Sequence, residues 1–220
     1  MDLLLIALAP ILIILVYIYV RDKYEKEPIG LLIKALAVGA LTVIPIIFVE
    51  KLLQAKGIYL EGYYSVAYTA FVVAAFSEEV FKFIALYFLI WKNKDFNEKF
   101  DGIVYAVFIS LGFASVENVM YVFQHGHATG ITRALTAVPG HALFGVAMGY
   151  YFGMAKLSKE NKMKNLLLAL IVPVGLHGLY DFILMTEHKY LIVAFIPFLY
   201  YLWKSGFKKM KELSDKSKFK

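Results

Sequence analysis

Six ionisable residues stand inside otherwise apolar stretches of this sequence: Glu78, Glu79, Glu117, His141, His177 and Asp181. Carboxylates and imidazoles are the groups with which enzymes most often move protons or bind metal ions. They can also join helices by hydrogen bonds, which is the ordinary explanation for a single polar residue in an apolar segment. For a set of six we favour function, because each uncompensated charge at mid-membrane costs about 2.5–3.5 kcal/mol.

Spacing connects the two adjacent acids to a lysine. Glu78 and Lys82 are four residues apart and would share one face of a helix. Glu79 would point about 100° away from Glu78, and Lys82 can reach either carboxylate. One acid held ionised beside a second that exchanges protons would suit general acid–base catalysis. A buried ion pair without a catalytic role explains this spacing equally well.

The remaining candidates also have neighbours at helical spacing. Asp181 follows His177 by four residues and can accept its ring N–H, which would set the direction of the imidazole. Asn118, next to Glu117, is expected to hydrogen-bond a neighbouring helix. Small residues that permit close helix packing follow His141 at four-residue steps: Gly145, Gly149 and Gly153.

The residues permit catalysis with or without a metal ion. His141, His177 and Glu78 would leave a fourth coordination position open, as in catalytic zinc sites. The soluble HExxH pattern is absent, and the absence of cysteine excludes a thiolate site. Without metal, Glu78 or Glu79 could activate water directly while a histidine stabilises the oxyanion. Both mechanisms, and the presence of zinc, stay open at this point.

Composition places the elements that carry these residues in a membrane. Of the 220 residues, 60% are hydrophobic and only 18% are charged, whereas soluble domains are nearer 45–50% apolar and about 25% charged. The net charge of +6 would fit a nucleic-acid partner. However, the basic residues lie between the apolar stretches and at the C-terminus, as in proteins whose partner is the lipid bilayer.

The sequence predicts an all-α, polytopic membrane protein with about seven transmembrane helices in a single domain, residues 1–220. The first apolar stretch lacks a positively charged leader and is expected to be retained as a helix. A helix of about 20 apolar residues spans a bilayer. The expected spans are residues 3–20, 30–49, 66–91, 103–123, 134–155, 166–185 and 190–207.

The distribution of lysine and arginine predicts the orientation. Most of them fall on one side of the expected spans, including the whole C-terminal tail, and few fall on the other. Because positive loops stay in the cytoplasm, we expect the N-terminus outside and the C-terminus inside. A rise of about 1.5 Å per residue then places the acids and imidazoles in the outer half of the membrane. His125 and His127 are expected in a solvated outer loop, residues 124–130.

Three of these motifs resemble the signature of PrsW-type intramembrane proteases: EEVFK at residues 78–82, FASVEN at 113–118 and HGLYD at 177–181. This group belongs to a wider superfamily that includes the CAAX prenyl endopeptidases and bacteriocin-processing enzymes. The similarity covers essentially the whole chain in order, through RDKYEKEP at residues 21–28, DGIVY at 101–105 and PGHAL at 139–143.

The resemblance implies a multi-pass protease of the bacterial cytoplasmic membrane that takes part in a stress response by regulated proteolysis. Its partner would be a membrane-anchored anti-sigma factor of the RsiW type. The enzyme would make the site-1 cut, after which further proteases free the sigma factor. The family's essential acids match Glu78 and Glu79, and its essential histidine matches His177. The prenyl endopeptidase branch carries histidine where this chain has Glu117, which disfavours that activity.

We therefore expect a Glu- and His-dependent peptide hydrolase. Glu78 or Glu79 is the expected base and Lys82 its electrostatic partner. His177, oriented by Asp181, would bind metal or stabilise the oxyanion, and His141 and Glu117 would complete the pocket. Three alternatives remain: a proton-coupled transporter, a receptor or scaffold without catalysis, and a prenyl-protein or bacteriocin-processing peptidase.

Overall fold

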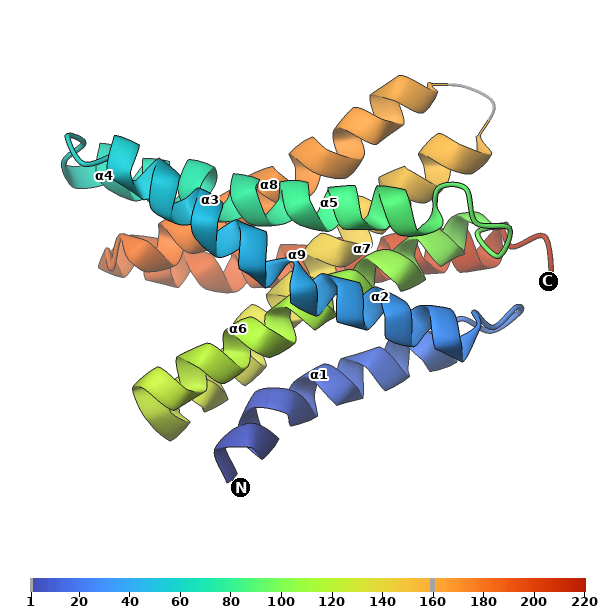
Figure 1. The fold of residues 1–220 in the computed structure, drawn as a ribbon, viewed down its shortest axis with the longest axis horizontal. Helices are drawn as coiled ribbons and strands as arrows, with labels where there is room; N and C mark the ends of the chain where they lie inside the picture. Colours follow the sequence, from blue (N-terminus) through green and yellow to red (C-terminus); the bar gives the residue numbers. More distant parts are fainter. Residues whose placement is uncertain (1, 159–160) are drawn as a thin grey trace.

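The computed structural model describes residues 2–158 and 161–220, and every regular element within them is a helix (Figure 1). This confirms the predicted all-α class. In chain order the elements are α1 (Asp2–Arg21), α2 (Ile29–Leu41), α3 (Val43–Lys56), α4 (Gly62–Tyr68), η1 (Thr69–Phe76), α5 (Ser77–Ile90), α6 (Lys99–Leu135), α7 (Ala137–Leu157), α8 (Lys162–Met185) and α9 (Lys189–Asp215).

Two of the long apolar segments consist of shorter helices joined end to end. α2 and α3 meet at Thr42, which keeps helical backbone angles and donates its hydroxyl to the Gly39 carbonyl at 2.6 Å. α4, η1 and α5 also follow one another through residues with helical angles. η1 is a π-helix that ends just before the two adjacent acids, Glu78 and Glu79. Such π-helical turns shift helix register and are frequent at functional sites.

Five segments of the described chain are long and apolar enough to cross a membrane: Asp2–Arg21, Ile29–Lys56, Lys99–Leu157, Lys162–Met185 and Lys189–Asp215. The third of them contains both α6 and α7. The chain is therefore a multi-pass membrane protein, as the composition predicts. The number of crossings and their orientation stay predictions.

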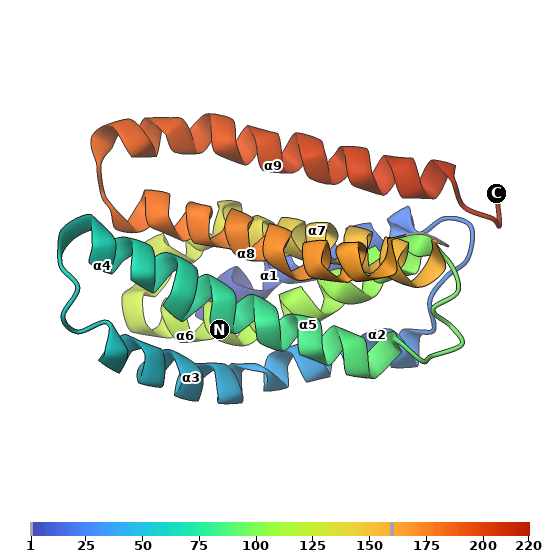
Figure 2. The ribbon, with the colours of Figure 1, turned by 90° about the horizontal axis from the view of Figure 1, so that it is seen from above.

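α6 and α7 form the core of the bundle and run through its middle (Figure 1). In the segment Lys99–Leu157, 72% of the most apolar stretch is buried within the protein, against 17% in Lys189–Asp215. α9 and α3 lie along opposite sides of the molecule (Figure 2). The charged residues of the core helices are therefore surrounded by protein rather than by lipid.

The glycine ridge on α7 explains how closely the two core helices approach. A Cβ atom on Gly149 would lie 2.2 Å from the carbonyl oxygen of Gly102, and one on Gly153 would lie 2.2 Å from that of Lys99. Both contacts are far shorter than a van der Waals distance, and they are made with rigid backbone. The predicted close packing is confirmed, and the partner is the first part of α6.

The outer helices carry large apolar side chains on their exposed faces. Leu5 and Ile13 of α1 are 60% and 68% exposed, and Ile196 of α9 is 71% exposed. Lipid tails are as apolar as these side chains, so their exposure carries no penalty in a membrane. The pattern agrees with lipid as the solvent around the bundle.

The expected loop at residues 124–130 is wrong. α6 continues as helix through this region to Leu135, and the only break within it is at Gly126, where φ is +80°. That backbone conformation is open to glycine at little cost, so the chain turns there and resumes its helix at once. His125 and His127 are thus helical residues, and the turn brings Arg133 back toward the first part of α6.

Candidate active site

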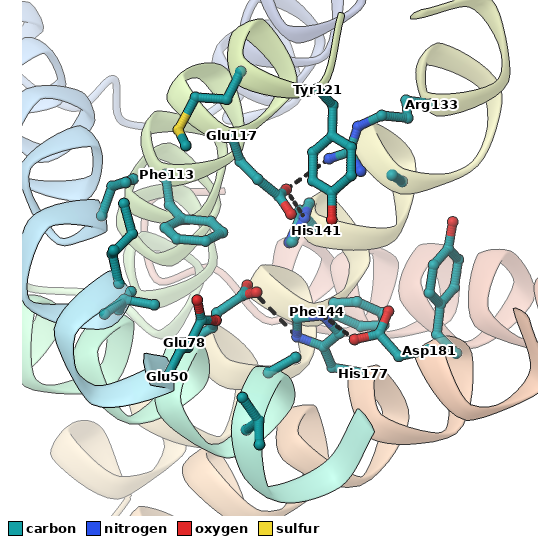
Figure 3. Close-up of a pocket in the computed structure, with 18 of the residues that line it drawn as sticks. Glu50, Glu78, Phe113, Glu117, Tyr121, Arg133, His141, Phe144, His177 and Asp181 are labelled. Atoms are coloured by element: carbon teal, nitrogen blue, oxygen red, sulfur yellow. Dashed lines mark hydrogen bonds and ion pairs between the residues drawn. The ribbon is translucent and has the colours of Figure 1, made fainter. Parts of the chain in front are cut away.

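Four helices bring the predicted residues together in one cluster, shown in part in Figure 3. α5 supplies its first turn, α6 and α7 each supply one residue, and α8 supplies two residues from one face. We call this group the site cluster: Glu78, Glu79, Lys82, Glu117, His141, His177 and Asp181. Residues far apart in the sequence therefore meet because α5, α6, α7 and α8 pack against one another.

Lys82 connects the two adjacent acids. Its Nζ donates to Glu78 Oε2 and to Glu79 Oε1, each at 2.9 Å, and lies 3.4 Å from His141 Nδ1. The ammonium also stands 4.1 Å from the centre of the Phe113 ring. The side chain is 1% exposed. Lys82 thus compensates two buried carboxylates at once, rather than one of them.

His177 lies between carboxylates on both sides of its ring. Nδ1 is 3.0 Å from Glu79 Oε1 and 3.9 Å from Glu78 Oε2, while Nε2 is 3.3 Å from Asp181 Oδ2. Phe144 stacks against the ring with the two centroids 4.8 Å apart. The expected contact between His177 and Asp181 is therefore present, and the ring has little freedom to turn.

A second chain of contacts holds His141. Its Nε2 is 2.9 Å from Glu117 Oε2, and Arg133 Nη2 donates to that same oxygen at 2.7 Å. Arg133 Nε donates to Asn118 Oδ1 at 2.8 Å, and Asn118 Nδ2 donates to the Ala7 carbonyl in α1 at 2.7 Å. The expected interhelical role of Asn118 is confirmed. Glu117 therefore lies against His141 at the wall of the cavity, and Arg133 anchors its carboxylate.

Only one of the two adjacent acids lines a cavity of about 380 Å³. Glu78 lines it, together with His141, His177 and Asp181, whereas Glu79 and Lys82 do not. Glu79 is fully buried, and its Oε2 has no hydrogen-bond partner among the described residues. A molecule that enters the cavity thus meets the Glu78 carboxylate, while Glu79 stays behind it.

Sequence reasoning missed several polar residues of this cavity, among them Glu50, Tyr121 and Arg133. Glu50 comes from α3 and points toward Glu78 (Figure 3). It directly follows the expected span 30–49, so the sequence does not mark it as an acid within an apolar span. Arg133 follows Glu117 by sixteen residues, a separation without helical meaning. Only the turn at Gly126 makes that contact possible, so helical spacing could not have found it.

The donor set fits a divalent metal ion. Glu78, Glu79, His141 and His177 each offer a ligand atom, and these four atoms lie within 4.8 Å of one another. Two imidazoles with carboxylate oxygens are a common ligand set for catalytic zinc. The unpartnered Glu79 Oε2 is a further buried oxygen that a cation would satisfy. The set contains the three predicted ligands and adds Glu79.

Comparisons with known protein sequences match nearly the whole chain. Residues 27–203 match the family described as "PrsW family intramembrane metalloprotease". Protease PrsW of Clostridioides difficile (strain 630) is 39% identical over 99% of this chain and 94% of its own length. The protein of the same name from Halalkalibacterium halodurans is 37% identical over 96% of this chain and 96% of its own length. The one from Bacillus subtilis (strain 168) is 36% identical over 93% of this chain and 92% of its own length. No solved structure matches significantly.

Proposed function

This chain belongs to the PrsW family of intramembrane metalloproteases, and we propose that it makes the site-1 cut in a membrane-anchored anti-sigma factor. The cut would begin the release of an extracytoplasmic-function sigma factor. Membership of a protease family removes the transporter and the non-catalytic receptor as alternatives. The observation that carries the proposal is the buried Glu–His cluster beside a cavity, because peptide hydrolysis needs an acid–base pair that substrate can reach.

The proposed topology suits such a cut. We propose seven crossings in one domain, residues 1–220, with the N-terminus outside the cell and the C-terminus in the cytoplasm. The excess of lysine and arginine on one side supports this orientation. In that arrangement the site cluster lies in the outer half of the membrane. A substrate segment just outside its own membrane anchor could then enter the cavity from the extracytoplasmic side.

In the proposed mechanism, Glu78 is the base because it is the acid of the adjacent pair that lines the cavity. Its carboxylate takes a proton from water as the oxygen attacks the peptide carbonyl, and returns that proton to the leaving amine as the C–N bond breaks. A zinc ion held by Glu79, His141 and His177, with Glu78 beside it as the base, would polarise the carbonyl and the attacking water. His141, held by Glu117, and His177, held by Asp181, present ring nitrogens whose directions are set before substrate arrives.

Three residues of the site cluster act through others in this proposal. Lys82 holds Glu78 and Glu79 in place. Glu117 directs His141, and Asp181 directs His177. Pre-organisation of this kind lowers the cost of reaching the transition state, because the groups need not reorient during the reaction. Glu79 Oε1 lies 3.0 Å from His177 Nδ1, and both atoms belong to the donor set.

Co-expression with an epitope-tagged anti-sigma factor tests the proposal. Wild-type protein should shorten the tagged substrate to a fragment of defined size on an immunoblot. Glu78→Ala, Glu79→Ala and His177→Ala should each abolish this fragment, whereas Glu61→Ala, at an exposed acid outside the cavity, should not. Undiminished cleavage by the three site variants would contradict the proposed mechanism. Cleavage of a prenylated peptide in place of the anti-sigma factor would overturn the substrate assignment.

A further inference from the structure

The ammonium of Lys82 stands among the atoms that would bind a metal ion. It hydrogen-bonds Glu78 Oε2 and Glu79 Oε1 at 2.9 Å and lies 3.4 Å from His141 Nδ1. These three residues belong to the four whose ligand atoms gather within 4.8 Å. The fourth, His177, is 3.0 Å from the same Glu79 oxygen. A single positive charge thus already contacts three of the four residues of the donor set.

An ammonium and a metal ion at these carboxylates would oppose each other. Lys82 hydrogen-bonds one oxygen of each adjacent acid at 2.9 Å, and a zinc ion would stand about 2.0–2.2 Å from its ligand atoms in the same cluster. Two cations this close repel each other, and the repulsion grows as the surroundings become less polar. The positive charge of Lys82 is therefore expected to weaken metal binding at this donor set.

The Phe113 ring also attracts the ammonium where it stands. Nζ lies 4.1 Å from the centre of this ring while it donates to both carboxylates, and an aromatic face attracts a cation in a poorly solvated site. The charge of Lys82 is therefore held at the donor set by the ring as well as by the two acids.

We propose that Lys82 and a divalent metal ion compete for the carboxylates of Glu78 and Glu79, so that Lys82 sets how tightly the protein holds its metal. The inference rests on the proposed function only in placing the family's metal at this donor set. Without metal, the ammonium keeps two buried carboxylates compensated, and their uncompensated burial would be strongly destabilising.

Zinc titration of the purified full-length protein in detergent tests the competition without any substrate. Zinc affinity is measured by competition with a chromogenic chelator, and bound zinc is counted by elemental analysis. Lys82→Met and Lys82→Gln should bind zinc about tenfold or more tighter than wild type, since a competing cation is removed. Lys82→Arg keeps the charge and should bind no tighter than wild type. Lys34→Met removes an exposed lysine from another membrane segment and should match wild type.

Thermal unfolding supplies a second readout that a purely structural lysine would not change. Lys82→Met should melt below wild type in the presence of chelator and recover when zinc is added, because zinc then supplies the missing cation. The melting temperature of the wild-type protein should rise less when zinc is added. Equal or weaker zinc affinity in both Lys82→Met and Lys82→Gln, or a melting deficit that zinc does not reduce, would overturn the proposal.

These outcomes are separable from the proposed function. Tighter zinc binding by Lys82→Met in a protein that leaves the anti-sigma factor intact would support the competition and contradict the substrate assignment. Cleavage of the anti-sigma factor by wild type, with zinc affinity unchanged by both neutral variants, would give the opposite result.

Discussion

The protein buries two groups of acidic side chains and compensates them differently. In the site cluster, cationic side chains hydrogen-bond the acids. Lys82 contacts Glu78 and Glu79, and Arg133 contacts Glu117. These contacts hold the carboxylates around a cavity. Lys82 lies on the same helix as Glu78 and Glu79, and Arg133 reaches Glu117 from the segment that follows the turn at Gly126.

The second group, which we call the loop cluster, joins the connection between α1 and α2 to the start of α6: Asp22, Glu27, Glu98 and Asp101. Asp101 Oδ2 accepts the backbone N–H groups of Asn97 and Glu98 at 2.8 and 2.7 Å. The Tyr105 hydroxyl donates to Glu27. Within the described chain, no lysine or arginine hydrogen-bonds these four carboxylates.

Burial shifts pKa values in the loop cluster upward, and that of Glu27 rises further than that of Asp22. Burial, with repulsion from Asp101, raises the pKa of Asp22 to about 7 and that of Glu27 to about 9. Burial also raises the pKa of Glu98. Buried acids that are paired with fixed cations can take part in catalysis. A buried acid that keeps its proton can instead form hydrogen bonds that join two loops. We therefore expect the same substitution, glutamate to glutamine, to affect activity differently in the two groups.

The largest contrast is expected between Glu78→Gln and Glu27→Gln. Loss of a general base lowers rates by about 10²–10⁴-fold, so Glu78→Gln should abolish cleavage of the tagged substrate. Glu27→Gln replaces an acid that already holds a proton near neutral pH, and cleavage should stay within about twofold of wild type. Quantitative immunoblots at matched expression measure both. Equal losses in the two variants would break the distinction between the clusters.

A smaller loss of activity is expected from Arg133→Leu. Removal of an outer partner of a functional ligand typically costs about 10–100-fold, and Glu117 would lose the donor that fixes it against His141. Arg133→Lys should retain more activity, since it keeps the charge. The same cleavage assay, with the double variant Arg133→Leu, Glu117→Gln, measures whether the two residues act as a unit. Strictly additive effects would show that Arg133 does not act through Glu117.

The smallest effect concerns the pH dependence of stability. The pKa of Glu27 rises from its ordinary 4.5 to about 9. Its contribution to stability is therefore complete below pH 4.5 and is lost as the pH rises through 9. Wild-type protein in detergent should melt progressively lower between pH 6 and pH 9, and Glu27→Gln should be flatter and about 2–4 °C more stable at the upper end. Glu61→Gln, at an exposed acid, is the matched control and should follow wild type.

Several features could be predicted from the chain alone. The apolar stretches predict an all-α membrane protein, and four-residue spacing predicts the contacts of Lys82 with Glu78 and of His177 with Asp181. These succeed because both ends of each contact lie on one helix, where geometry follows from residue number. The prediction of a loop at residues 124–130 is wrong because this polar stretch stays helical on both sides of Gly126, where a single glycine turns the chain.

Residue types and local spacing marked the acids and imidazoles as candidates for a site, because such groups are costly within apolar helices. The resemblance of the motifs to a protease family added peptide hydrolysis. Packing alone decided which of the two adjacent acids faces the cavity, since the rotation of α5 about its axis depends on its neighbours α3, α6 and α8. Packing also brought Arg133 to Glu117 and put the Lys82 ammonium among the metal donors. The six polar residues recognisable in the sequence thus became an ordered site only when four helices met.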